Sequence, residues 1–86
     1  MEDLDVKVYP NPTRAKYHIE FNSIAKEDVT IRLTNQQGQL IDVIEIEVPV
    51  GQHILQYDAS KLPGGVYNLT INGSDSSIQK KLIKLN

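Results

Sequence analysis

Apolar and polar residues alternate along several stretches of this chain, and this period of two limits its possible folds more than any other feature. A β-strand points successive side chains to opposite faces of its sheet, so an alternating stretch buries one face and leaves the other in water. Such strands are typical of antiparallel sheets solvated on one side. The clearest apolar triplets are Tyr17, Ile19 and Phe21; Val29, Ile31 and Leu33; and Tyr67, Leu69 and Ile71.

The alternation, together with the turn residues between the runs, predicts seven strands. They are expected over residues 4–9, 16–22, 28–34, 39–48, 52–57, 65–72 and 77–85. In the fourth strand, Ile41 and Val43 fall on the face opposite to that of Ile44, which predicts a β-bulge near Val43. Evenly spaced short strands without a capped helix indicate an all-β fold, an immunoglobulin-like antiparallel β-sandwich. The expected core contains Ile19, Phe21, Ile31, Leu33, Leu55, Tyr67 and Leu69.

The turn sequences agree with this fold. "NQQG" at residues 35–38 fits a type I turn followed by a left-handed glycine. "LPGG" at residues 62–65 predicts a type II turn with positive φ at Gly64. Near the amino terminus, Pro10 and Pro12 lack amide donors and Asn11 favours an Asx-turn, so this stretch is expected to end the first strand. We expect residues 1–86 to form a single domain, with residues 1–4 as a linker.

The composition argues against most kinds of chemistry. The net charge of −2 opposes nucleic-acid binding, and the absence of cysteine excludes disulfides. Ser60, His53 and Asp58 are close only in sequence, so we expect no catalytic residue, and no metal or cofactor site is expected either. Acidic rows at Asp3, Asp5, Glu45 and Glu47 are interpreted as a solvated face or as charge that discourages edge-to-edge pairing, and a loosely bound calcium ion is the alternative that the residues leave open. His18 and His53 are too isolated to form a metal site.

The segment "KKLIK" at residues 80–84 carries a local positive charge. Lys80, Leu82 and Lys84 share one face of a strand, and Lys81, Ile83 and Leu85 share the other. One interpretation is an edge strand that lysines protect from aggregation. The other is a basic strand that a partner recognises by strand addition. The residues alone leave both interpretations open.

Four stretches resemble a known family in their order and spacing. They are "VYPNPT", "VTIRLTNQQGQLI", "LPGGVYNLTI" and "KKLIKLN", and together they span almost the whole chain. The chain therefore resembles the type A C-terminal sorting domain of the type IX secretion system of Bacteroidetes. The family's motif positions fall on Pro10, Asn11, Pro12, Gly65 and Tyr67, and its lysine-rich last strand falls on Lys80, Lys81 and Lys84. Asn68 departs from the pattern, because the family often carries an apolar residue there.

The resemblance implies a domain without catalytic activity that directs an upstream cargo protein across the outer membrane and is then removed by a surface sortase. The implied partners are the translocon, an outer-membrane shuttle protein and the sortase, with recognition expected at Lys80, Lys81, Leu82, Ile83, Lys84 and Leu85. The implied location is the periplasm in transit, followed by the cell surface or the medium. The alternative is a structural spacer domain like the immunoglobulin-like domain of flagellar hook-capping proteins. The end of the sequence after "KKLIKLN" favours sorting.

Overall fold

The computed structural model describes residues 4–9, 15–74 and 76–85, and within these residues the chain forms seven strands and no helix. The described residues therefore contain no helix that could span a membrane. Each strand begins and ends within one residue of its predicted bounds. The strands are β1 (Leu4–Tyr9), β2 (Lys16–Ser23), β3 (Glu27–Asn35), β4 (Leu40–Val48), β5 (Gly51–Asp58), β6 (Gly65–Asn72) and β7 (Ser77–Lys84).

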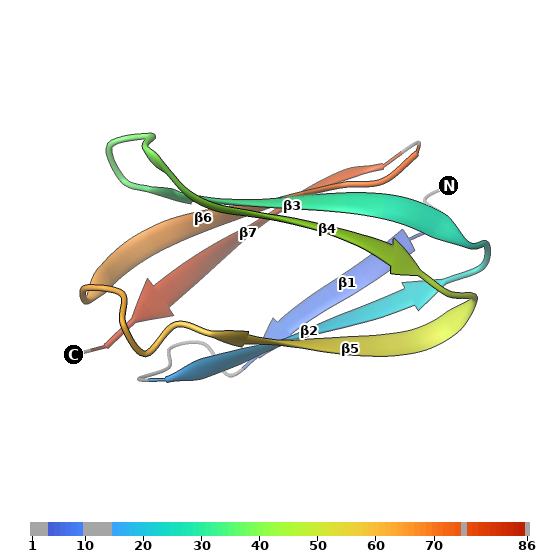
Figure 1. Cartoon of the computed structure of the whole chain (residues 1–86), viewed down its shortest axis with the longest axis horizontal. Coiled ribbons are helices and arrows are strands. Elements are labelled where there is room, and N and C mark those ends of the chain that lie inside the picture. Colours follow the sequence, from blue (N-terminus) through green and yellow to red (C-terminus); the bar gives the residue numbers. More distant parts are fainter. Residues whose placement is uncertain (1–3, 10–14, 75, 86) are drawn as a thin grey trace.

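The strands form two antiparallel sheets that lie face to face (Figure 1). Sheet A has the order β1-β2-β5, and sheet B has the order β4-β3-β6-β7. The chain changes sheets at β2–β3, β4–β5 and β5–β6, so each sheet combines strands that are distant in sequence. This arrangement confirms the predicted antiparallel sandwich. It also leaves β4 and β7 as the two edges of the larger sheet.

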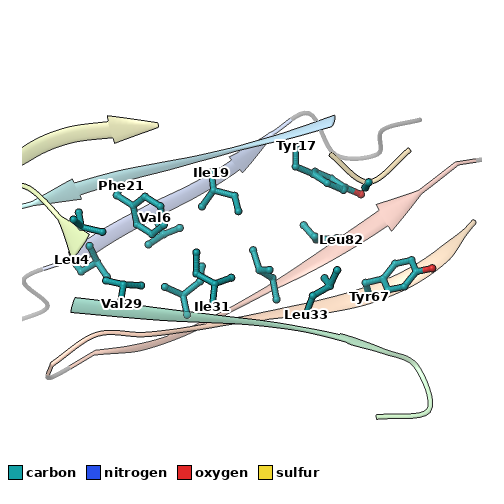
Figure 2. Packing of buried hydrophobic residues seen from close by; sticks show 14 residues of the cluster. Leu4, Val6, Tyr17, Ile19, Phe21, Val29, Ile31, Leu33, Tyr67 and Leu82 are labelled. Carbon is teal, nitrogen blue, oxygen red and sulfur yellow. The ribbon is translucent and has the colours of Figure 1, made fainter. Parts of the chain in front are cut away.

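The core lies between the sheets and is built from the alternating apolar residues of both (Figure 2). Six of the seven expected core residues are buried, whereas Leu55 is only partly buried because its strand, β5, lies at the edge of sheet A. Phe21 is fully buried and lies beside Val6 of the neighbouring strand β1 (Figure 2). The buried apolar residues are Leu4, Val6, Tyr17, Ile19, Phe21, Val29, Ile31, Leu33, Val48, Ala59, Tyr67, Leu69, Ile71 and Leu82.

The β-bulge in β4 lies at Ile41 and not at Val43. The β3–β4 ladder runs without a break from Glu27↔Val48 to Leu33↔Asp42, and Thr34 then pairs with Leu40, so that Ile41 is the extra residue. Val43 follows the regular alternation and faces outward, 42% exposed. The sequence shows that the apolar pattern changes phase, but an outward-facing valine is indistinguishable from a bulged one in the pattern alone.

The two predicted turns have different outcomes. At residues 35–38, Gly38 has a φ of +82°, its amide donates to the Asn35 carbonyl at 3.0 Å, and the Asn35 side chain accepts the Gln37 amide at 3.0 Å, which confirms the predicted turn. The type II turn at residues 62–65 is wrong, because Gly64 does not have positive φ. Positive φ occurs at the next residue, Gly65, at +155°, where β6 begins.

Candidate functional site on the last strand

The basic segment singled out in the sequence forms most of β7, at one edge of sheet B. β7 is hydrogen-bonded to β6 in a regular antiparallel register from Gly65↔Lys84 to Asn72↔Ser77. Its carboxyl end lies at the end of the sandwich opposite to the start of β1 (Figure 1). The site is therefore a terminal edge strand, the kind of element that can accept a further strand from a partner.

The pleat of β7 divides the predicted recognition residues between two surfaces. Leu82 faces the core and is 2% exposed, and Lys80 on the same face is half-buried. Lys81, Ile83 and, just beyond the strand, Leu85 face outward and are exposed. We call Lys81, Ile83 and Leu85 the outer row. Only this row, out of the predicted set, is exposed to a partner of the folded domain.

Lys84 is the unexpected member of the set, because it is buried with only 6% of its surface exposed. Its Nζ donates a hydrogen bond to the carbonyl oxygen of Leu85 at 2.9 Å. The aliphatic stem of the lysine covers the end of the core while its ammonium group reaches the chain end, as long basic side chains commonly do. Lys84 therefore contributes to the packing of β7 and offers little charge at the outer surface.

A buried tyrosine of the opposite sheet holds the end of β7. Tyr17 in β2 is 1% exposed, and its hydroxyl donates to the carbonyl oxygen of Ile83 at 2.7 Å. Burial, with a smaller contribution from Tyr67, raises the pKa of the Tyr17 hydroxyl, so the group stays protonated and keeps its donor role. The alternation places Tyr17 in the core, and a buried tyrosine hydroxyl needs a hydrogen-bond partner, so the sequence indicates that a partner exists. It does not indicate that the partner is the carbonyl group of Ile83.

The Gly-x-Tyr motif lies directly beside the end of β7. Gly65 is opposite Lys84 in the ladder, and Tyr67 is opposite Leu82. The Tyr67 hydroxyl donates to the Pro63 carbonyl at 2.6 Å, which fastens the loop before β6 in the manner of a tyrosine corner. The side chain of Asn68, the residue that departs from the family pattern, faces outward and is exposed. The main-chain carbonyl of Asn68 accepts a hydrogen bond from the Thr34 hydroxyl at 3.4 Å. The departure therefore does not disturb the core.

A buried carboxylate, Glu27, fixes the loop that leads into β7, and no motif in the sequence marks this residue. Glu27 is 6% exposed; its Oε1 accepts the Ser74 amide at 2.9 Å, and its Oε2 accepts the Ser23 hydroxyl at 3.4 Å. A Cβ atom at Gly73 would lie 2.8 Å from Glu27 Oε1, so this loop approaches the carboxylate as closely as a glycine permits. The start of β7 is therefore anchored as well as its end.

The other candidate residues do not assemble into a reactive site. Asp58 accepts the Ser60 amide at 2.9 Å, and the hydrogen bonds from Ser60 lower the pKa of the Asp58 carboxyl, which identifies an Asx-turn. His53 lies about 16 Å away along β5, next to Phe21. Among the described residues, no three His, Asp or Glu side chains are grouped as metal ligands would be. Pro10, Asn11, Pro12 and Asp3 lie outside the described residues.

Comparisons with known proteins agree with this fold. The family model described as "Secretion system C-terminal sorting domain" matches residues 7–85. Among solved structures, dimeric latent PorU from Porphyromonas gingivalis is similar, with a TM-score of 0.72 and 18% sequence identity. The similarity covers 95% of this chain and 9% of the PorU chain, so this chain corresponds in fold to a small part of that protein. No curated protein sequence matches this chain.

Proposed function

The chain belongs to the family of secretion system C-terminal sorting domains, which act as export signals of the type IX system, and we propose that the secretion machinery recognises it through the outer row of β7. Membership of the family implies export across the outer membrane toward the cell surface or the medium. The observation that carries the more specific proposal is the position of β7, a terminal edge strand with an exposed outward face.

The edge position gives a partner two means of recognition. An edge strand offers main-chain groups that a further strand can pair with, and its alternate side chains supply specificity. In the outer row, the charge of Lys81 lies next to Ile83 and Leu85, which are each 37% exposed. We therefore expect the receptor to present an acidic group beside an apolar surface. Recognition of this kind is faster at low salt, because screening weakens the attraction between exposed charges.

The shape of the domain is compatible with a cargo joined ahead of β1. The start of β1 and the end of β7 lie at opposite ends of a body 37 Å long (Figure 1). A folded cargo attached ahead of Leu4 would therefore lie away from Leu85. We propose that the domain has no catalytic role of its own, that the translocon and the outer-membrane shuttle protein bind it during passage through the periplasm, and that the surface sortase then removes it.

The test is an export assay with matched surface variants. Residues 1–86 are fused behind a periplasmic reporter in a host with a type IX system, and the reporter is measured in the periplasm and outside the cell. The test variant is Lys81→Glu with Ile83→Ser. The control is Lys7→Glu with Ile54→Ser, which makes the same chemical changes at exposed positions of sheet A. Surface variants are used because deleting residues 80–86 would also remove buried Leu82.

We expect the intact fusion and the control to leave the cell, and the β7 variant to accumulate in the periplasm with a melting temperature close to that of the intact domain. Export of the β7 variant at the intact level would show that the outer row is not recognised. If the intact fusion itself remained in the periplasm, the spacer alternative would be the better account of this domain.

A further inference from the structure

The two edges of sheet B carry opposite charge and matching apolar residues. β4 presents Glu45 and Glu47 on its outward face, and β7 presents Lys81 on its outward face. Exposed apolar side chains accompany the charges on both edges, with Val43 at 42% and Ile83 at 37%. We propose that β7 of one copy of this domain adds to β4 of a second copy, so that sheet B continues from one molecule into the next.

The direction of the strands permits this addition. Every neighbouring pair in sheet B is antiparallel, so β4 and β7 run in opposite directions at its two edges. A second copy shifted along the sheet therefore brings its β4 beside β7 in the antiparallel arrangement. The contact joins two different surfaces, so it is heterologous and can repeat from copy to copy.

A specific register makes the two edges complementary. If Lys81 lies opposite Glu45, then Ile83 lies opposite Val43 on the outward face, and Leu82 lies opposite Ile44 on the core face. A shift by two residues places Ile83 opposite Glu45 or Lys81 opposite Val43, and a shift by one exchanges the two faces. The matched register thus combines opposite charges with apolar pairs, both of which stabilise adjacent strands.

The surface beside Glu45 has room for the incoming side chains. A hollow of about 480 Å³ lies along the second half of β4 on the outward face of sheet B, lined by Asp28, Val29, Thr30, Glu45, Ile46 and Glu47. In the matched register, Lys81 and Gln79 of the second copy are the residues next to this hollow. Of the two β4 carboxylates that line the hollow, Glu47 already pairs with Lys26 at 3.4 Å, so Glu45 is the one suited to the ammonium group of an incoming lysine.

The alternative pairings of identical edges are less favourable. Two β4 strands that pair about Glu45 bring that carboxylate against its own copy, and two β7 strands that pair about Lys81 bring two ammonium groups together. Like charges directly opposite each other destabilise a strand pair. The charges therefore select the pairing of β4 with β7, and a second copy of this chain is the partner that carries both edges.

The first experiment measures self-association of the 86-residue chain by sedimentation over a range of concentrations, at low and at high salt. We expect larger species at high concentration that dissociate with salt. Glu45→Lys and Lys81→Glu should each weaken association by about tenfold or more, because each places like charges opposite. An equimolar mixture of the two variants should associate again, since each β4 then meets a β7 of opposite charge. Lys7→Glu, which changes charge on sheet A, should associate like the unchanged chain.

The second experiment tests the register by disulfide formation, since the chain has no native cysteine. Directly opposite residues have Cα atoms about 4.5–5.5 Å apart, within the range of a disulfide. Val43→Cys mixed with Ile83→Cys should give a disulfide-linked dimer. Val43→Cys mixed with Gln79→Cys, which moves the thiol about 13 Å along β7, should not. A chain that stays monomeric at all concentrations, a mixture of charge variants that fails to associate, or equal yields in the two cysteine mixtures would each overturn the proposal.

Discussion

Both edges of sheet B are linked to sheet A by the hydrogen bond of a tyrosine hydroxyl. The two links differ in their burial and in the group that accepts the hydrogen bond. At β7, the hydroxyl of buried Tyr17 donates to the main-chain carbonyl of Ile83 at 2.7 Å. At β4, the hydroxyl of half-buried Tyr57 donates to the exposed carboxylate of Asp42 at 3.1 Å. The first link is part of the core, and the second lies where water competes with it.

The side chains of the two strands show the same difference. β7 buries Leu82 and Lys84 at its carboxyl end, whereas the first half of β4 leaves Leu40 56% and Ile41 39% exposed. β7 is therefore held by its ladder to β6 and by its inner face, which leaves its outward face accessible while the strand stays in place. An edge strand attached in this way can be recognised without first leaving the sheet. The first half of β4 differs, because its apolar side chains Leu40 and Ile41 are exposed and do not hold the strand to the core.

The largest difference between the two edges is expected for truncation of an apolar side chain. Leu82→Ala should lower the free energy of unfolding by about 2–4 kcal/mol, because it leaves a cavity between the sheets. Leu40→Ala on β4 should change it by less than about 0.5 kcal/mol, since that side chain is mostly in water. Urea unfolding of both variants provides the measurement. Equal losses would mean that the two edges are packed alike.

The strands were predictable because the side-chain alternation is itself the packing pattern. Tyr17, Ile19 and Phe21 point into the core as their spacing requires, and the Asn35–Gly38 turn follows from the local chemistry of asparagine and glycine. The strand position of the candidate site was predictable for the same reason. The lysine-rich segment does form an edge strand, because β7 is last in the spatial order of sheet B and pairs with β6 on one side.

The features that the sequence did not predict depend on neighbours that are distant along the chain. Lys84 is buried on the core-facing side of β7, opposite the start of β6, a placement that no local pattern encodes. Leu55 is only partly buried because β5 has a neighbour on one side. The Tyr17–Ile83 contact joins residues 66 positions apart. Such contacts are set by sheet order, which the period of two does not contain.

An intermediate effect is expected when the two tyrosine hydroxyls are removed. Tyr17→Phe should lower the free energy of unfolding by about 1 kcal/mol, because it deletes a buried hydrogen bond to β7 and keeps the ring. The amides of β7 should also exchange with solvent faster, as a sign of local opening. Tyr57→Phe should cost less than about 0.5 kcal/mol at neutral pH, because its link is exposed. Similar losses in the two variants would remove the distinction between the links.

The smallest effect is expected at the β4 link and appears only in alkaline solution. Burial, the hydrogen bond to Asp42 and the nearby charges of Asp42 and Asp58 raise the pKa of Tyr57 from its ordinary value of 10.0 to about 12. The folded state therefore holds the phenolic proton more tightly than the unfolded state. The stability that follows is fully present below pH 10 and is lost as the pH rises toward 12. Because the link lies near the surface, solvent screening reduces this contribution.

Thermal melts of the unchanged chain and of Tyr57→Phe between pH 9 and pH 12 isolate this contribution. Both proteins keep Tyr17, whose pKa burial also raises, so that group lowers both curves alike. The unchanged chain should start slightly more stable and then lose stability faster, so that the two curves converge or cross between pH 10 and pH 12. Parallel curves over that interval would show that Tyr57 holds its proton no more tightly in the folded chain. The exposed carboxylate of Asp42 would then add nothing to the attachment of β4. The contact between β4 and sheet A would depend on the packing of Val48 and the core-facing isoleucines alone.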